Sequence, residues 1–220
     1  MALGRLSEIQ ERVLIALAAL QPPWTLTGGA ALAGFHTKHR ETRDLDMFFH
    51  GQRSLGDSAI RAIQTLEAAG FSAVSLRTSA TFSQLSVRSG SDTVVVDLVA
   101  DPTPRAEQPQ PTAVGDSTIL VETPHQLLVN KLNALLSRSE LRDLVDVRAL
   151  LAVGGDLGRA LGDCPGQDAG FSPLTFSWAT RGLPISTLAK ALGWSDADTQ
   201  ELERFRDGLV DQVLVSARPE

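Results

Sequence analysis

The sequence predicts an α+β fold: a β-sheet covered by helices in the first half of the chain, followed by a helical C-terminal module. Two observations indicate this. The segments with strand patterns end before residue 100, and after residue 111 the apolar residues recur at helical spacing. Between them, residues 101–111 contain four prolines and no apolar pattern. We therefore predict two domains, a core over residues 1–110 and the helical module over residues 111–220.

The first element is expected to be a helix from about Ser7 to Leu20, because apolar residues recur there at helical spacing. Ser7 is a suitable N-cap, and Pro22-Pro23 ends the helix. Gly70 is expected to end a later helix as its C-cap. The other elements of the core are expected in this order: strand 24–27, short helix 30–35, basic loop 36–43, strand 44–49, helix 57–69, and strands 71–77, 82–88 and 93–99, the last two joined as a hairpin.

The C-terminal module is expected to consist of helices alone. Residues 154–170 are rich in glycine and receive no assignment. The tryptophans, Trp24, Trp178 and Trp194, are expected in the core rather than on a base-stacking surface. The predicted helices of the module span residues 124–136, 141–153, 172–180, 185–192 and 196–215.

The composition is that of a globular protein: of 220 residues, 43% are hydrophobic and 21% are charged. A formal net charge of -6 argues against a large non-specific nucleic-acid surface. Cys164 is the only cysteine, so no intrachain disulfide can form. The apolar run Val13–Leu20 follows acidic residues, unlike a signal peptide, and no stretch reaches the roughly 18 apolar residues of a membrane span. We therefore expect a cytoplasmic protein with no membrane partner.

Three features of the core have the chemistry of a phosphoryl-transfer site, and the first is Thr27-Gly28-Gly29. Two adjacent glycines let backbone N–H groups approach a phosphate without side-chain obstruction. The start of the following helix adds partial positive charge. Glycine pairs are also common in ordinary turns, so this pair is a weak signal by itself.

The second feature is Asp44-Leu45-Asp46 at the start of a strand. Residues i and i+2 of a strand share a face, so the two carboxylates project together. Like charges this close are unfavourable unless a cation stabilises them, and Mg²⁺ prefers carboxylate and phosphate oxygens. The alternative is a polar strand end whose acidic residues are balanced by Arg40 and Arg43.

The third feature is Asp97, a lone carboxylate in an otherwise apolar strand. Burying a charge is expensive, so Asp97 needs a metal, an arginine or hydrogen-bond donors as a partner. A place beside the Asp44 strand would complete a three-carboxylate cluster. The alternative is a sheet edge that faces water, and Asp101 is a second candidate. Together with a phosphate cradle, the cluster would supply the parts of two-metal phosphoryl or nucleotidyl transfer.

These residues together resemble the signature of the DNA polymerase beta-like nucleotidyltransferases. The pattern is Gly28-Gly29-x14-Asp44-x-Asp46, with a spacing about one residue longer than the usual form. The stretch TGGAALAGFHTKHRETRDLDMFF is most similar to the AbiEii-type (abortive infection) toxin nucleotidyltransferases. The resemblance covers roughly residues 24 to 151 and implies a mixed, nucleotidyltransferase-type sheet with flanking helices.

A second region, residues 125–151, resembles the helical motif of the same family. The resemblance implies that Lys131 contacts the triphosphate. Arg138 matches the arginine that follows this lysine in the family motif. Arg142, Asp143 and Asp146 match its Arg-Asp-x-x-Asp element. From the residues alone, Lys131 could instead lie on a solvated helix face, and the acidic pair could form a structural salt bridge. Asp146 is therefore either a site residue or part of a clamp between two helices.

We therefore predict a metal-dependent enzyme that transfers a nucleoside monophosphate from a nucleoside triphosphate to an acceptor hydroxyl. The predicted metal is Mg²⁺, with Mn²⁺ as the alternative. The resemblance implies a toxin with a separately encoded antitoxin, and RNA, including the tRNA 3′ end, or a protein as the acceptor. The predicted metal ligands are Asp44, Asp46 and Asp97. These three aspartates and Asp146 are the predicted catalytic residues. The predicted nucleotide-binding residues are Thr27, Gly28, Gly29, Arg43 and Lys131.

Two alternatives remain open. One is a transferase of the antibiotic-modifying type that acts on a small molecule, which the acidic net charge fits at least as well. The other is a non-catalytic module that binds a nucleotide or a partner, which the presence of all three carboxylates disfavours. His36 and His39 lie in the basic loop without a third ligand nearby in sequence. We therefore expect this loop to face phosphate or acceptor rather than metal.

Overall fold

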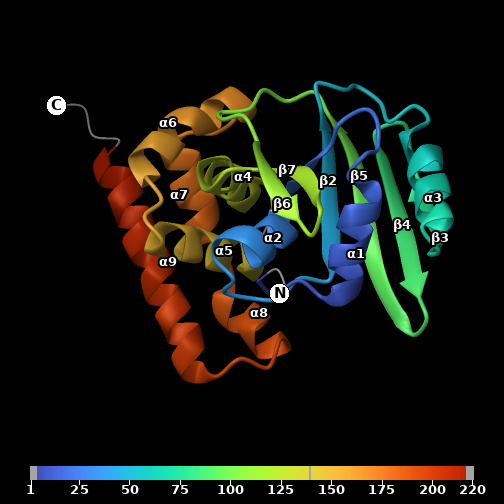
Figure 1. Cartoon of the computed structure of the whole chain (residues 1–220). Helices are drawn as coiled ribbons and strands as arrows, with labels where there is room; N and C mark the ends of the chain where they lie inside the picture. The colour runs from blue at the N-terminus through green and yellow to red at the C-terminus, as the bar shows by residue number, and fades with distance from the viewer. Residues whose placement is uncertain (1–3, 139, 217–220) are drawn as a thin grey trace. The chain divides into compact units, whose positions relative to one another are not determined.

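Two units make up the chain, and they divide after Thr123. The computed structural model describes residues 4–138 and 140–216 (Figure 1). The predicted domain ranges also included residues 1–3, 139 and 217–220, which lie outside the described residues. The division falls later than the predicted boundary after residue 110, because two strands beyond that point belong to the sheet of the first unit.

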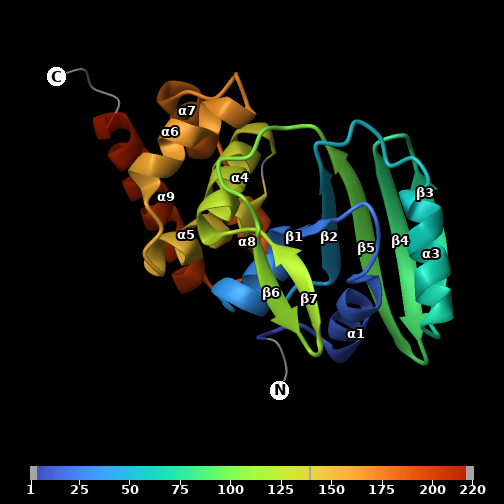
Figure 2. The ribbon, with the colours of Figure 1, turned by 45° about the horizontal axis from the view of Figure 1, so that its top comes forward.

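The first unit is built on a seven-stranded sheet. Its strands are β1 (Thr25–Thr27), β2 (Asp44–His50), β3 (Ser72–Thr78), β4 (Phe82–Ser89), β5 (Asp92–Asp101), β6 (Gln110–Val114) and β7 (Ser117–Val121). The strand order is β3-β4-β5-β2-β1-β7-β6 (Figure 2). β2 pairs in parallel with β5 and β1 with β7, whereas the other neighbours are antiparallel. This mixed sheet with its helices confirms the predicted α+β class.

The helical segments of the first unit are α1 (Glu8–Leu17), which precedes β1, and α2 (Gly28–Ala31), the π-helical turn η1 (Leu32–His36) and α3 (Ser58–Ala68), which connect strands. α1 starts at Ser7, as predicted. The Ser7 hydroxyl accepts a hydrogen bond from the Gln10 N–H, and the Gln10 side chain accepts one from the Ser7 N–H, which is a capping box. Gly70, with φ +87°, follows the end of α3.

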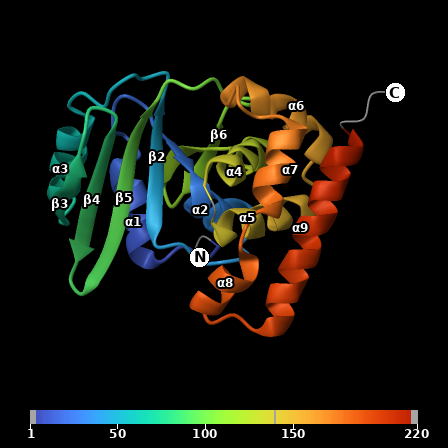
Figure 3. The ribbon, with the colours of Figure 1, turned by 180° about the vertical axis from the view of Figure 1, so that it is seen from behind.

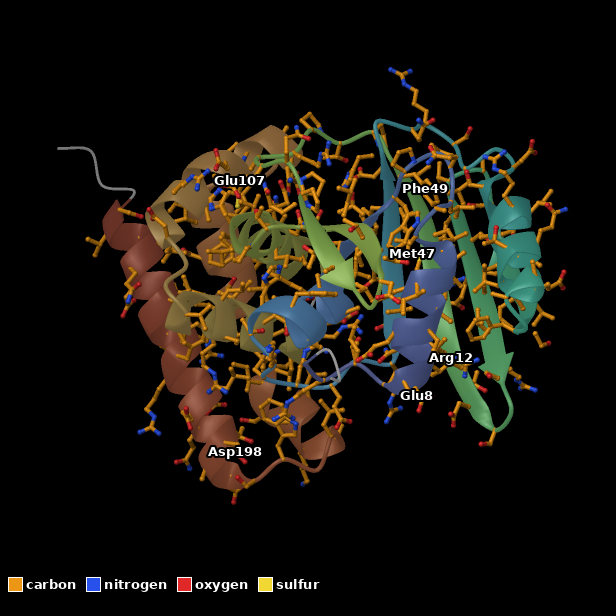
Figure 4. The ribbon with its side chains drawn as sticks, in the orientation of Figure 1. Glu8, Arg12, Met47, Phe49, Glu107 and Asp198 are labelled. Atoms are coloured by element: carbon orange, nitrogen blue, oxygen red, sulfur yellow. The ribbon has the colours of Figure 1, made fainter. Side chains whose placement is uncertain are left out.

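The two faces of β2 have different environments. Leu45, Met47 and Phe49 are fully buried, and Figure 4 labels the last two along the strand. The residues between them, from Asp44 to His50, are half-buried. α1 and α3 lie side by side against the sheet (Figure 1). The alternation of the strand therefore places the apolar residues in the core and leaves the aspartates on the opposite, polar face.

The hairpin β6–β7 corrects the prediction of helices alone after residue 111. β6 is an edge strand, and it contains Pro111. Proline has no N–H to donate to a ladder, so it is tolerated at a sheet edge. The four prolines of residues 101–111 therefore concealed a short edge strand, and Gly115, with φ +56°, forms the turn to β7.

The second unit is helical, as predicted. Its elements are α4 (Pro124–Ser137), α5 (Leu141–Ala152), α6 (Leu157–Gln167), α7 (Pro173–Arg181), α8 (Ile185–Ala191) and α9 (Asp196–Ser216). α6 occupies the glycine-rich stretch that received no assignment, and α7 and α9 pack together (Figure 3). Cys164 on α6 is buried, and burial, followed by the charge of Asp163, raises the pKa of its thiol to about 12. In the described part of the chain, no helix is long and apolar enough to cross a membrane.

The tryptophans differ from the prediction that all three are in the core. Trp24 is buried, and its indole N–H donates to the Leu17 carbonyl at 2.8 Å. Trp194 is half-buried. Trp178 on α7 is 82% exposed, and Leu174, one turn earlier, is 70% exposed. The expectation for Trp178 is therefore wrong, because the helical pattern of α7 does not distinguish its buried face from its solvent face.

The capping box gives a direct test of the first unit. Replacing Ser7 by alanine should lower the free energy of unfolding by about 1 kcal/mol, because the first turn of α1 loses its capping oxygen. Urea unfolding in a Trp178→Phe, Trp194→Phe background, where Trp24 is the sole tryptophan, measures this by fluorescence, since the Trp24 indole donates to the end of α1. Ser54→Ala, in an exposed loop, is the control and should change stability by less than about 0.5 kcal/mol. Equal effects of the two changes would contradict the role of the cap.

Candidate active site

A row of polar residues crosses the polar face of the sheet. Asp46 on β2 pairs in register with Asp97 on β5, and with Thr27 on β1. Asp97 in turn pairs with Gln84 on β4, whose amide donates to the Asp97 carboxylate at 2.9 Å. Residues paired in register share a face, so four strands bring these side chains together from distant parts of the sequence.

The glycine turn lies directly against Asp46. Gly28 has a φ of +62°, a conformation that side-chain-bearing residues rarely adopt. A Cβ atom at Gly28 would overlap Oδ2 of Asp46, so only glycine fits beside this carboxylate. A Cβ atom at Gly29 would lie 2.9 Å from the Thr42 hydroxyl and 3.2 Å from a guanidinium nitrogen of Arg40. The glycines predicted to bind phosphate therefore lie next to Asp46, one of the predicted metal ligands.

The loop before β2 holds Asp44 and carries positive charge. The Thr42 hydroxyl donates to the Asp44 carboxylate at 2.7 Å. Arg40 lies against Gly29, whereas the predicted nucleotide-binding residue Arg43 is exposed. Lys38 in the same loop has a φ of +52°, which is unusual for a residue other than glycine. The loop thus presents cations beside the glycine turn and fixes the first aspartate.

The environment of Asp97 makes it a stronger base than an ordinary aspartate. Burial raises the pKa of its carboxyl group, and the nearby charge of Asp44 raises it further. The hydrogen bond from Gln84 and the charge of Arg77 lower the pKa, but the net change is upward. The effect of the Asp44 charge on Asp97 indicates that β2 and β5 bring these two predicted carboxylates within electrostatic reach.

The donor atoms of this cluster suit a hard divalent cation. Within the described residues, no three His, Cys, Asp or Glu side chains are placed closely enough to hold a metal ion by themselves. Mg²⁺ does not require such a cage, because it is usually bound by one or two carboxylates together with substrate phosphates. Asp44 and Asp46, beside a glycine turn that can approach a phosphate, fit that pattern of ligands.

Asp101, the second candidate for the third carboxylate, has a different partner. It pairs in register with His50 at the far end of β2, and His50 Nδ1 lies 3.2 Å from its Oδ2 atom. Burial raises the pKa of Asp101, but hydrogen bonds from His50 and Thr103 outweigh this effect and lower it. Asp101 is therefore bound to its neighbours, and Asp97 is the carboxylate that joins the row with Asp46.

Lys131, in the second unit, is enclosed by acidic residues. It is 6% exposed, so a solvated helix face is excluded for it. Its ammonium group on α4 lies 2.8 Å from Asp143 and 2.8 Å from Asp146, both on α5 and fully buried. Arg138 makes two further hydrogen bonds to Asp143, at 2.7 and 2.9 Å. Asp146 and Lys131 thus clamp α4 to α5.

Arg142 does not join this cluster but forms an ion pair with Glu140 that is about half exposed. Burial raises the pKa of Asp143, yet the hydrogen bonds from Arg138 and Lys131 outweigh it, so the pKa lies below its usual value. A carboxyl group whose pKa is lowered on folding stabilises the folded state at pH values above the pKa that the group has in the unfolded chain. This contribution is lost as the pH falls through the folded-state value.

Several residues at the site were not expected from the sequence. Gln84 occupies the polar face of an alternating strand, but only the pairing of β4 with β5 reveals its partner. Glu122 is buried just after β7, and its carboxylate accepts a hydrogen bond from the Thr27 hydroxyl. The sequence signal for Glu122 is limited to a carboxylate that follows the apolar run of β7.

Known structures share this arrangement of elements. JHP933 from Helicobacter pylori is 15% identical, with 96% of each chain covered and a TM-score of 0.57. MenT4, a nucleotidyltransferase toxin from Mycobacterium tuberculosis H37Rv, is 18% identical over 96% of this chain and 91% of its own, with a TM-score of 0.56. An antigenic nucleotidyltransferase-like protein from Paracoccidioides brasiliensis is 15% identical over 90% and 94%, with a TM-score of 0.52. The fold is that of the nucleotidyltransferases.

The family follows from the sequence itself. Residues 12–211 match the family model described as nucleotidyl transferase AbiEii toxin, type IV toxin–antitoxin system. The chain therefore belongs to the AbiEii family of nucleotidyltransferase toxins, as the resemblance implied. No curated protein matches the sequence.

The hydrogen bond between Gln84 and Asp97 leads to a pH prediction. Gln84→Leu should raise the pKa of Asp97 further, because the interaction that lowers it is removed while burial remains. A carboxyl group whose pKa is raised on folding stabilises the fold at low pH, and this stability is lost as the pH rises through the folded-state pKa. The substitution should move that loss to higher pH.

Carbon-13 NMR titration of labelled aspartate carboxyls, assigned with Asp97→Asn, measures this change. Ser86→Ala, on the same strand and face, is the control and should leave the Asp97 titration in place. An unchanged titration of Asp97 in the Gln84→Leu protein would disprove the assigned cause.

Removal of the buried cation should damage the second unit. Lys131→Met leaves Asp143 and Asp146 buried without their shared partner, and breaking a buried ion pair from one side lowers stability by about 3–5 kcal/mol. Arg181→Met breaks the exposed ion pair with Asp211 and should lower the free energy of unfolding by less than about 1 kcal/mol. Urea unfolding at neutral pH compares the two variants. Similar small losses would show that the clamp contributes little to the fold.

Proposed function

We propose that this nucleotidyltransferase toxin uses Mg²⁺ to transfer a nucleoside monophosphate from a nucleoside triphosphate to an acceptor hydroxyl. The observation that carries the proposal is the meeting of the glycine turn with the carboxylates. Gly28 packs against the carboxylate of Asp46, and Asp46 pairs in register with Asp97. A backbone that can approach phosphate oxygens thus lies beside hard oxygen ligands. Mn²⁺, which takes similar ligands, is the alternative metal.

Asp44 and Asp46 would hold the metal, which when bound would neutralise phosphate charge and lower the pKa of a bound hydroxyl. The chain supplies the remaining functions. The backbone at Gly28 and Gly29 positions the triphosphate, so that the reaction is favoured by orientation. Asp97, with its raised pKa, is suited to assist the second metal position and to accept the proton of the attacking hydroxyl.

The cations around the site have a role in charge neutralisation. Arg40 lies against Gly29, and Arg43 is exposed at the start of β2. Both would counter the negative charge of a triphosphate. The resemblance implies a triphosphate contact for Lys131 as well, and within the second unit its ammonium group is held by Asp143 and Asp146.

We further propose that the acceptor is the 3′ hydroxyl of an RNA such as tRNA, a choice supported by the basic loop over residues 36–43. The net charge of -6 means that such binding depends on this local basic surface rather than on the whole protein. Membership of a type IV toxin–antitoxin family also implies a cognate antitoxin.

The proposal is tested with purified protein, Mg²⁺ and each α-labelled ribonucleoside triphosphate, with total RNA as the acceptor. Label should enter RNA with one preferred base. Asp46→Asn should reduce the rate by about a thousandfold, because several kcal/mol of metal-assisted charge stabilisation is lost. Glu67→Gln, exposed on α3, is the matched control and should transfer label at the wild-type rate.

Aminoglycosides and mixed cellular protein serve as separate acceptors in the same assay. Transfer only to a small molecule or to protein would refute RNA as the acceptor but retain the chemistry. Undiminished transfer by Asp46→Asn would refute the metal site itself.

A further inference from the structure

We infer that Glu122 is a positioning residue that holds the glycine turn in the geometry needed for nucleotide binding. Glu122 is 1% exposed, and a carboxylate is rarely buried this deeply without specific partners. It lies immediately after β7, outside the motifs of the nucleotide site. The inference rests on the proposed function, since the position of the turn matters for activity only if a triphosphate binds there.

Contacts from Glu122 reach both sides of the turn. Its backbone N–H donates to the Leu26 carbonyl at 3.0 Å, and its carboxylate Oε2 accepts a hydrogen bond from the Thr27 hydroxyl. Its backbone carbonyl accepts a hydrogen bond from Nε2 of His36, at 2.8 Å. Leu26 and Thr27 precede the glycines, whereas His36 ends the helical segment that follows them. One residue therefore anchors the turn at both ends.

The contact with Thr27 explains why this hydroxyl does not cap the following helix. Thr27 occupies the N-cap position of α2, yet its side chain makes no capping hydrogen bond. The hydroxyl donates to Glu122 instead, which sets the orientation of the last residue before Gly28. Because Gly28 packs against Oδ2 of Asp46, a displacement of Thr27 would change how the turn meets that carboxylate.

Glu122 also approaches the strand that carries the aspartates. Its Oε1 atom lies 3.7 Å from Nε2 of His50, whose other ring nitrogen faces Asp101 at 3.2 Å. The imidazole of His50 is 9% exposed and belongs to β2, the strand of Asp44 and Asp46. The two carboxylate oxygens of Glu122 thus face β1 and β2, and they link the phosphate-binding turn to the strand of the metal ligands.

The test measures nucleotide affinity rather than turnover. Calorimetry of the full chain with Mg²⁺ and the α,β-methylene analogues of ATP, GTP, CTP and UTP gives the dissociation constant. Glu122→Ala should weaken binding about tenfold, because the hydrogen bond that orders the turn is lost. Glu122→Gln should restore most of the affinity, since its amide oxygen still accepts the Thr27 hydroxyl.

Two further variants separate positioning from a general loss of structure. Thr27→Val removes the donor of the same hydrogen bond, and combining it with Glu122→Ala should weaken binding no more than either change alone. Glu203 in the second unit accepts a hydrogen bond from the Ser186 hydroxyl at 2.6 Å. Glu203→Ala therefore removes the same kind of hydroxyl–carboxylate pair without changing a residue that contacts Leu26, Thr27 or His36, and it should bind the analogues with wild-type affinity.

Wild-type affinity in folded Glu122→Ala, or an equal loss in Glu203→Ala, would overturn the inference. If Glu122→Ala does not fold, as judged by circular dichroism, the Thr27→Val protein decides, and wild-type affinity there would overturn it. A wild-type protein that binds none of the analogues would refute the proposed nucleotide site instead, so the two failures are distinct.

Discussion

The in-register parallel pairing of β2 with β5 is the constraint on which the site depends. It places Asp46 next to Asp97 on one face, where like charges on neighbouring strands are unfavourable. Burial and the charge of Asp44 raise the pKa of Asp97, and the Gln84 amide relieves only part of this effect. The fold thus retains an arrangement in which the charged form of Asp97 is less favourable than that of an ordinary aspartate.

The pKa values of Asp143 and Asp97 are shifted in opposite directions. In the second unit, Asp143 and Asp146 share the ammonium group of Lys131, and Arg138 adds two hydrogen bonds, so the pKa of Asp143 is lowered. In the first unit, the pKa of Asp97 is raised. Hydrogen bonds and nearby cations outweigh the effect of burial at Asp143, whereas they do not at Asp97.

Much of the fold could be predicted from periodicity, and part of the site from spacing. The period of two along β2 shows that Asp44 and Asp46 share a face, and the glycine pair marks the turn before them. Strand pairing is not encoded in local spacing, so the partnership of Asp97 with Gln84 and the role of Glu122 could not be predicted. Prolines concealed β6 for the same reason: local composition indicated a linker, whereas the sheet edge tolerates proline.

The state of Cys164 has a practical consequence for studying this toxin. Its thiol is buried, and at neutral pH a pKa of about 12 leaves almost none of it as the reactive thiolate. Because it is the only cysteine in the sequence, a cysteine introduced at an exposed position would react alone with a maleimide dye. The natural chain therefore serves as a ready background for site-specific fluorescent labels, without removal of its own cysteine.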